Sequence, residues 1–325
     1  MQVVITGGAG FLGQRLARSL LKQGSLPDRN GQLQAISKIT LVDVAAAVGF
    51  DDARIEQVTG DITERALLER VITPQTAAVF HLAAIVSGQA EADFDLGMRI
   101  NLDASRLLLE RCRSCANVPR VIFTSSVAVF GGVLPAVVQD DTALNPQSSY
   151  GTQKAIAELL LNDYSRKGFV DGRILRLPTI SVRPGKPNQA ASSFASGIIR
   201  EPLNGQPAIC PVAPDTRLWL LSPRKVIASL IHGYTLSAEV LGKSRTVNLP
   251  GISVTVAEMV AALERVAGKQ VAARVGWAHD PVIDRIISSW PGAWDASRAA
   301  ALGFVGDADF DDIVRAYIED DLPAV

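Results

Sequence analysis

The sequence predicts an α/β protein in which a doubly wound parallel sheet is accompanied by a smaller C-terminal α/β domain. Two observations carry this prediction. In the first half of the chain, short and nearly continuous apolar runs alternate with segments of helical periodicity, a pattern typical of parallel strands covered by helices on both faces. The chain also has 325 residues, which suits one large domain with a smaller one beside it.

The predicted elements of the first half follow one another in β–α order. Apolar and β-branched runs predict strands at residues 3–6, 38–42, 54–58, 78–82, 120–124 and 172–177. Helical spacing predicts helices at residues 11–23, 63–71, 98–112 and 149–167. The polar segment 24–38 is predicted to be an insertion after the first helix.

After about residue 178 the regular alternation stops, because seven prolines from Pro178 to Pro214 interrupt the chain. Further on, helices are predicted at 223–237, 257–267 and 309–318, and a strand is predicted at 246–249 that can return to the main sheet. We therefore expect a first domain of residues 1–178 plus about 219–251. A second domain would comprise about 179–218 plus 252–325.

Composition and charge argue against several classes of protein. A net charge of −1 gives no broad attraction to nucleic acid or to an anionic membrane, so neither partner is expected. No apolar run reaches the ~18 residues of a membrane span, and the start of the chain does not resemble a signal peptide. Three cysteines, including the pair Cys112 and Cys115, complete neither a disulfide framework nor a zinc site, so no metal and a cytoplasmic location are expected.

Glycines at positions 7, 10 and 13 stand between the first predicted strand and the first predicted helix. This context indicates a dinucleotide site: Gly7 permits the tight turn, Gly10 lets the backbone approach a pyrophosphate, and Gly13 allows close packing of helix and strand. Asp43 ends the second strand, where a carboxylate can accept both ribose hydroxyls and would repel a 2′-phosphate, so the predicted cofactor is NAD. The first domain would then be a Rossmann-like NAD-binding domain and the second a substrate-binding domain.

Two further segments are predicted to line the cofactor site. Gly60-Asp61-Ile62 resembles a turn that holds an adenine ring, with Asp61 accepting from its amino group. Leu82-Ala83-Ala84 ends the fourth strand with small residues that let a cofactor lie flat against the backbone. His81, just before them, is expected in the core or behind the site and not as a catalyst.

Tyr150 and Lys154 are four residues apart and share one face of a predicted helix. A tyrosine titrates near ~10 and is a poor base at neutral pH, but a nearby ammonium and the positive end of a helix lower its pKa. Ser126 lies at the end of the preceding strand. Together with the glycine turn, these residues predict a base placed over a nicotinamide ring.

These segments resemble the extended short-chain dehydrogenase/reductase family, which includes NAD-dependent nucleotide-sugar epimerases and dehydratases. The matching motifs are TGGAGFLG, LVD, GDIT, HLAA, FTSSVAVFG and SSYGTQK, and they cover most of the first 180 residues. The resemblance implies that Ser126 bonds the substrate hydroxyl, that Tyr150 is the acid/base and that Lys154 is its partner. It further implies cofactor contacts by Phe11, Leu12, Asn101 and Pro178, and a substrate contact by Ser125.

The chain departs from the nucleotide-sugar members of this family at several positions. Thr179 stands where they usually carry an Asn, Val127-Ala128 replaces the acidic residues of dehydratases, and Phe130 replaces a tyrosine. The segment LRLPTISVRPGKPN (residues 175–188) is instead similar to the D-erythronate dehydrogenases. That resemblance implies NAD-dependent oxidation of D-erythronate, a small sugar acid, to 2-dehydro-D-erythronate.

A sugar acid requires a cation for its carboxylate, and a guanidinium can hold a carboxylate through two hydrogen bonds. Arg183 and Arg217 are both candidates for this contact. Ser87, Thr179 and Asn188 are candidates for contacts to the sugar hydroxyls.

Two other functions stay open at this point. One is an epimerase or another dehydrogenase on the same core, for example one that acts on a uronate or on L-threonine. The other is a non-catalytic NAD-binding regulator, although such relatives often lack the Tyr or the Lys. The family commonly forms homodimers through the helices predicted at 98–112 and 149–167, so a homodimer is expected.

Overall fold

The computed structural model describes residues 1–186 and 190–322. Its centre is a seven-stranded sheet in the order β12-β8-β7-β6-β1-β4-β5, and all neighbouring strands are parallel. In that order the strands span Thr246–Asn248, Asp171–Leu177, Arg120–Ser126, Thr76–His81, Gln2–Thr6, Lys38–Asp43 and Ile55–Thr59. The predicted parallel sheet is confirmed, and the strand order reverses between β1 and β6, where open α/β sheets bind their ligands.

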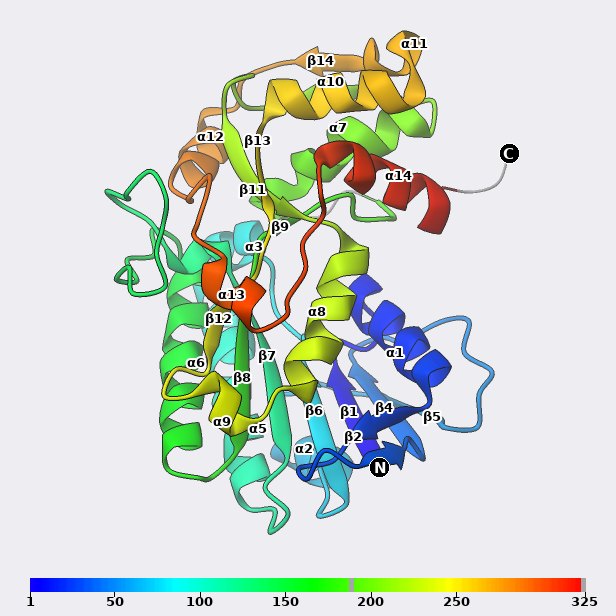
Figure 1. Cartoon of the computed structure of the whole chain (residues 1–325), viewed down its shortest axis with the longest axis vertical. Helices are drawn as coiled ribbons and strands as arrows, with labels where there is room; N and C mark the ends of the chain where they lie inside the picture. Colours follow the sequence, from blue (N-terminus) through cyan, green and yellow to red (C-terminus); the bar gives the residue numbers. More distant parts are fainter. Residues whose placement is uncertain (187–189, 323–325) are drawn as a thin grey trace.

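Helices cover both faces of this sheet (Figure 1). Side chains of a strand alternate between the faces, so Val3 and Ile5 lie in the core under α1 and α8, whereas Val4 lies in the core under α2, α5 and α6. These helices span Phe11–Gln23, Pro223–Thr235, Arg65–Val71, Ala104–Arg113 and Ser149–Arg166, respectively. The two faces therefore belong to two separate apolar cores, as expected for a doubly wound sheet.

A second group of elements stands beyond the carboxyl ends of the main strands (Figure 1). It contains a three-stranded sheet of β9 (Thr179–Ile180), β11 (Arg217–Leu221) and β13 (Ile252–Thr255), in the order β13-β11-β9. It also contains the pair β10 (Ala208–Cys210) and β14 (Val275–Trp277), with α7 (Phe194–Leu203), α10 (Val256–Ala267) and α14 (Phe310–Asp320). The expected boundary near residue 219 falls inside β11, and the division into two domains stays a proposal.

Several short elements were not predicted from the sequence. The insertion forms a hairpin of β2 (Ser25–Pro27) and β3 (Leu33–Ala35), and the helix predicted from residue 98 begins as a π-helix, η1 (Met98–Asp103). The helices α3 (Ser87–Ala92) and α4 (Phe94–Gly97) lack an apolar repeat long enough to predict them. The remaining elements are η2 (Val127–Val129), η3 (Ala191–Ser193), α9 (Ala238–Leu241), α11 (Lys269–Ala272), α12 (Pro281–Ser288) and α13 (Ser297–Ala301).

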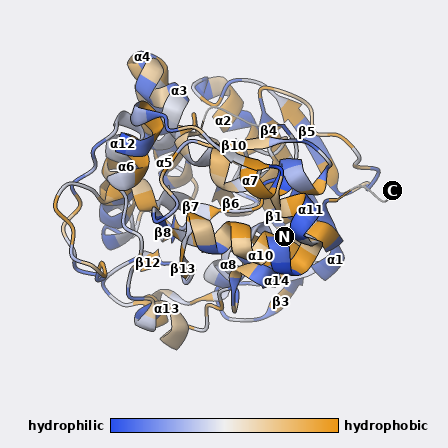
Figure 2. Cartoon of the chain, turned by 90° about the horizontal axis from the view of Figure 1, so that it is seen from above, coloured by the Kyte–Doolittle hydropathy of each residue, from blue (hydrophilic) through white to orange (hydrophobic). Residues whose placement is uncertain are grey.

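Seen from above, the helices carry both hydrophilic and hydrophobic residues, as expected for helices with one buried face (Figure 2). Within residues 1–186 and 190–322, no helix is both long and apolar enough to cross a membrane. In the same part of the chain, no group of three or more His, Cys, Asp or Glu side chains is placed to hold a metal ion.

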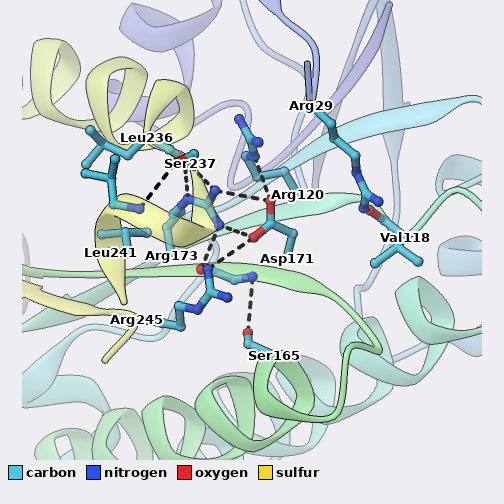
Figure 3. Close-up of polar contacts among 12 residues, drawn as sticks. Arg29, Val118, Arg120, Ser165, Asp171, Arg173, Leu236, Ser237, Leu241 and Arg245 are labelled. Atoms are coloured by element: carbon cyan, nitrogen blue, oxygen red, sulfur yellow. Dashed lines mark hydrogen bonds and ion pairs between the residues drawn. The ribbon is translucent and has the colours of Figure 1, made fainter. Parts of the chain in front are cut away.

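A cluster of charges joins the sheet to α8 at the amino-terminal edge of β7 and β8 (Figure 3). The carboxylate of Asp171 accepts from Arg120 at 3.0 Å, from Arg173 at 3.1 Å and from Arg245 at 3.3 Å. Burial acts to raise the pKa of Asp171, but hydrogen bonds and charges from Arg173 and Arg120 hold it below its usual value. Arg173 also donates to the carbonyl oxygen of Leu236 at 3.1 Å, just after the end of α8, so the cluster fixes that helix on the sheet.

Candidate active site

A cavity of about 420 Å³ lies at the carboxyl edge of the main sheet. Its wall is formed by the ends of β1, β4, β6, β7 and β8, by the first turns of α1 and α6, and by residues around β9 and η3. Most of the predicted site residues line it: Gly7, Gly10, Phe11, Leu12, Gly13, Asp43, Asp61, Ile62, Leu82, Ala83, Ala84, Ser87, Ser125, Ser126, Tyr150, Lys154, Pro178, Thr179 and Arg183.

Among the described residues, two predicted site residues, Asn101 and Arg217, are not in this wall. Asn101 is buried behind it, and Asn188 lies outside the described residues. Arg217 lies on β11 with a half-exposed side chain that donates to the carbonyl oxygen of Ser253 at 3.2 Å and lies 3.9 Å from the Glu258 carboxylate. The structure therefore does not bring Arg217 to the cavity.

Three described residues with polar side-chain groups line the cavity without having been assigned to the site: Thr124 at the end of β7, Ser192 and Trp290. Ser192 comes from η3, and Trp290 follows α12. Both lie in irregular stretches after residue 178, where no periodic pattern predicts which side chains point inward. The signal that could have found them is the resemblance to the D-erythronate dehydrogenases, which extends to Ser192 and to the surroundings of Trp290.

The glycine turn leaves no room for side chains. Gly7 has a φ of 72°, and a Cβ there would lie 2.8 Å from the backbone nitrogen of Ala83. A Cβ on Gly13 would lie 2.2 Å from the carbonyl oxygen of Gly7. Helix α1 begins beside the cavity, and no side chain caps its N-terminus and no acidic residue occupies its first turn. The residues present thus fit a pyrophosphate, which uncapped helical N–H groups bind well.

Two carboxylates, those of Asp43 and Asp61, line the cavity at the ends of β4 and β5. Asp43 ends β4, lines the cavity, and accepts from the backbone nitrogen of Ala9 at 3.0 Å through Oδ2. Asp61 accepts from the backbone nitrogen of Thr63 at 2.9 Å through Oδ1, so the turn after β5 is held by its own side chain. Both positions fit the adenosine end of a dinucleotide.

Asn101 supports the cavity wall from behind. Its Oδ1 accepts from the backbone nitrogen of Ile85 at 2.8 Å, and its Nδ2 donates to the carbonyl oxygen of Ile85 at 3.1 Å. The same Nδ2 donates to Oε1 of Gln153 on α6 at 2.7 Å. Asn101 is 1% exposed, so in this structure it holds the segment after β6 against α6 instead of facing the cavity.

Close packing brings Tyr150 beside Ser126. Ser148 is the N-cap of helix α6, and its Oγ accepts from the backbone nitrogen of Gly151 at 3.2 Å. A Cβ on Gly151 would lie 2.1 Å from the carbonyl oxygen of Ala128, so only glycine lets the first turn of α6 contact the turn that follows Ser126. The i, i+4 spacing then places Lys154 on the same face of the helix.

The surroundings of Tyr150 act on the pKa of its phenol in opposite directions. Burial raises the pKa of its phenol to about 12, whereas a side-chain hydrogen bond from Ser126 and the charge of Arg183 both lower it. The sequence predicted that Lys154 lowers the pKa of this tyrosine, but in the structure the charge that lowers it is that of Arg183. Arg183 lies in the segment after β9, whereas Lys154 lies with Tyr150 on α6.

Lys154 is 2% exposed and donates from Nζ to the carbonyl oxygen of Thr124 at 2.9 Å. Its Nζ lies 4.6 Å from the centre of the Phe123 ring and 5.7 Å from the centre of the Tyr150 ring. Burial lowers the pKa of Lys154 to about 8, while the charge of Glu158 acts to raise it. The ammonium is thus held at the end of β7 by a carbonyl and by aromatic faces.

Arg183 presents a guanidinium to the cavity. Its Nη2 donates to Oγ of Ser192 at 3.1 Å, and among the described residues no carboxylate lies within ion-pair distance of it. Burial and the neighbouring Arg200 lower the pKa of Arg183 to about 10, and at neutral pH it still carries a positive charge. An unpaired cation in a partly buried wall fits an anionic ligand.

Ser125 adds an unsatisfied hydroxyl to the same wall. It is 2% exposed, and its Oγ has no hydrogen-bond partner among the described residues. Buried hydroxyls are usually hydrogen-bonded, so this atom fits a contact to a bound hydroxyl group.

The chain is similar to known proteins over nearly its whole length. Residues 3–219 match the model of the NAD dependent epimerase/dehydratase family. The chain is 66% identical to a D-erythronate dehydrogenase of Cupriavidus necator over 98% of both proteins, and 48% identical to a D-erythronate dehydrogenase of Haemophilus influenzae over 99% of this chain and 100% of that protein. A solved structure described as a nucleoside-diphosphate-sugar epimerase from Agrobacterium tumefaciens superposes with a TM-score of 0.91 at 45% identity, covering 98% of this chain and 94% of that one. The chain belongs to the NAD-dependent epimerase/dehydratase family.

Proposed function

We propose that the protein oxidises D-erythronate to 2-dehydro-D-erythronate with NAD as the hydride acceptor. The observation that carries this proposal is the guanidinium of Arg183, which has no carboxylate partner among the described residues and lines the same cavity as Tyr150 and the glycine turn. A carboxylate bound by Arg183 would place the neighbouring C2 hydroxyl within the same small cavity as the phenol. Two relatives that cover the whole chain are named D-erythronate dehydrogenases, which supports the choice of substrate.

The choice of NAD over NADP rests on Asp43. Its carboxylate lines the cavity at the end of β4, where it can accept two ribose hydroxyls. A 2′-phosphate at that place would meet a like charge. The family assignment supports the use of a nicotinamide cofactor, and Asp43 supports its non-phosphorylated form.

The chemical step uses the hydroxyl, the phenol and the ammonium that the cavity brings together. Ser126 and Tyr150 would hold the C2 hydroxyl, and the phenolate of Tyr150 would take its proton. Lys154 would keep positive charge near the phenolate as it forms. NAD, when bound, supplies the hydride acceptor for the hydrogen on C2. Ser126, Tyr150 and Lys154 are therefore proposed as the catalytic residues.

The remaining contacts follow from the cavity wall. We assign the substrate carboxylate to Arg183 and not to Arg217, because only Arg183 lines the cavity. Ser87, Ser125 and Thr179 are proposed to contact substrate hydroxyls. The cofactor is proposed to contact Gly7, Gly10, Phe11, Leu12, Gly13, Asp43, Asp61, Ile62, Leu82, Ala83, Ala84, Tyr150, Lys154 and Pro178.

We also keep the homodimer as a proposal. On α6, Leu159 is 65% exposed, and α5 packs beside α6. An exposed leucine on a long helix fits a helical interface with a second copy. The described cysteines Cys112, Cys115 and Cys210 form no disulfide, which fits the reducing cytoplasm that we propose as the location.

A substrate screen tests the proposed function. Purified protein is mixed with NAD or NADP and with D-erythronate, other sugar acids, L-threonine or a UDP-sugar, and NADH is followed by absorbance. We expect steady NADH formation with D-erythronate and NAD, and its loss in Tyr150→Phe, while that variant still binds NADH. Turnover of a UDP-sugar without net NADH would instead establish an epimerase and overturn the proposal. Turnover that survives in Tyr150→Phe would remove Tyr150 from the mechanism.

A further inference from the structure

His81 is a buried histidine to which neither the fold nor the proposed chemistry assigns a role. It is the last residue of β6, is 2% exposed and does not line the cavity. Its Nδ1 lies 2.7 Å from Oγ1 of Thr6 at the end of β1, and its Nε2 lies 2.9 Å from Oγ of Ser105 on α5. The ring therefore bridges the central sheet and the helix layer that covers it.

The hydrogen bonds around the ring determine which nitrogen carries the proton. The hydroxyl of Ser105 donates its single hydrogen to the carbonyl oxygen of Asn101 at 2.7 Å. Its oxygen can therefore only accept from His81, which puts the hydrogen on Nε2. Nδ1 is then an acceptor for the hydroxyl of Thr6, and Oγ1 of Thr6 accepts from the backbone nitrogen of Ala83 at 3.3 Å. When the ring is neutral, each hydrogen in this series of hydrogen bonds is therefore donated to one acceptor.

The surroundings also keep the ring neutral. Burial and the nearby charge of Lys154 together lower the pKa of His81 to about 3. At the pH where a dehydrogenase works, His81 therefore adds no positive charge that would oppose the ammonium of Lys154.

The chain of bonds reaches segments that form the cavity wall. At one end, Thr6 leads into the glycine turn and binds the backbone of Ala83. At the other end, Ser105 binds the carbonyl oxygen of Asn101, whose side chain holds both backbone groups of Ile85 and contacts Gln153, the residue before Lys154. The ring thus ties the glycine turn, the segment after β6 and helix α6 to one another.

We propose that His81 is a positioning residue that sets the distance between the nicotinamide side of the cofactor site and the helix carrying Tyr150 and Lys154. It acts through Thr6 on the glycine turn and the backbone of Ala83, and through Ser105 and Asn101 on the segment around Ile85. This inference rests on the proposed function, since it presupposes that a dinucleotide lies against that segment. Its test is therefore built on NADH binding as well as on turnover.

Three variants distinguish the contributions of the two hydrogen bonds of the His81 ring, to Thr6 and to Ser105. His81→Phe keeps the size of the ring and loses both bonds, His81→Asn can still accept from Thr6, and His81→Gln can still donate to Ser105. NADH affinity is measured by fluorescence without substrate, kcat and KM with D-erythronate, and the kinetic isotope effect with substrate deuterated at C2. We expect His81→Phe to weaken NADH binding and lower kcat by about tenfold each, with an altered isotope effect, and the other two variants to lie between it and the wild type.

His232→Phe is the matched control. The ring of His232 lies 2.7 Å from the carbonyl oxygen of Leu302 and packs edge-on against Phe304, away from the cavity, so its loss is expected to change the melting temperature only. If His81→Phe behaves in the same way, with NADH affinity and isotope effect unchanged, His81 is a core residue and the inference is wrong. Ser105→Ala tests the chain independently if His81→Phe does not fold, and unchanged NADH binding in that variant would also overturn it. If the wild-type protein binds NADH and the variants weaken that binding as expected, but D-erythronate is not oxidised, then only the proposed substrate is wrong.

Discussion

Glu158 and Arg176 form a bidentate ion pair buried one helical turn beyond Lys154. The Arg176 Nε lies 3.0 Å from Oε1 of Glu158, and its Nη2 lies 2.7 Å from Oε2. The Glu158 side chain is 2% exposed and the Arg176 side chain is 8% exposed, so water cannot solvate either charge if its partner is removed. Glu158 also acts to raise the pKa of Lys154, and Arg176 keeps Glu158 in place for that task.

The Glu158→Gln variant is expected to lower the free energy of unfolding by about 3 to 5 kcal/mol, because the Arg176 charge stays buried without its partner. Urea unfolding of the purified variant measures this loss. The double variant Glu158→Gln, Arg176→Met removes both charges and should recover part of it. A single variant as stable as the wild type would show that water reaches Arg176 and that the pair is not buried in solution.

The pH dependence of oxidation should follow Tyr150. Because the phenolate is the base and burial raises the pKa of the phenol to about 12, kcat/KM should rise with pH through the neutral range. The hydroxyl of Ser126 lowers that pKa, so Ser126→Ala should move the profile to higher pH and reduce the rate at pH 7 by about 10- to 100-fold. Ser125→Ala is the control: it should weaken substrate binding without moving the profile. A profile that is the same in both variants would contradict the assignment.

Arg183→Met should raise KM for D-erythronate by about 100-fold, since a charge-assisted contact to the carboxylate is lost, and should leave NADH affinity unchanged. Arg217→Met is the control, because Arg217 is about half exposed and bonded to Ser253 outside the cavity. Steady-state kinetics of both variants give the comparison. A larger effect at Arg217 than at Arg183 would reverse our assignment of the carboxylate site.

Asp43→Asn should shift the preference for NAD over NADP toward NADP by at least about tenfold, because the charge that repels a 2′-phosphate is removed while the side chain keeps its size. The ratio of kcat/KM with the two cofactors is the measurement. Asp61→Asn removes a carboxylate from the adenine side of the same cavity and should leave the ratio unchanged. An equal shift of this ratio in both variants would mean that the total negative charge of the cavity, and not the contact of Asp43 to the ribose, decides the cofactor preference.

Gly13→Ala should abolish NADH binding and lower the melting temperature, because the added Cβ would lie 2.2 Å from the carbonyl oxygen of Gly7. Gly197→Ala on α7 is the control, since its Cβ would meet only Glu201 at 3.6 Å and alanine favours a helix by about 1 kcal/mol over glycine. Calorimetry and NADH fluorescence report both effects. A Gly13→Ala protein that binds NADH normally would show that the turn can open.

The local sequence was sufficient to predict the parts of the site that are formed within short segments of the chain. The glycines between β1 and α1, Asp43 at the end of β4, and the four-residue spacing of Tyr150 and Lys154 were predicted, and all of them line one cavity. They could be predicted because each depends on a turn, a strand end or one helix face, which neighbouring residues determine. The parallel sheet was predicted for the same reason, from apolar runs that read directly as strands.

The tertiary structure alone decided which side chains reach the cavity from distant segments. Arg183 and Arg217 were equal candidates in the sequence, but only the path of the chain after β9 turns Arg183 toward Tyr150 while β11 holds Arg217 outside. Asn101 and His81 likewise gained their supporting positions from partners on other strands and helices. Long-range packing sets the direction of such side chains, and no local pattern encodes it.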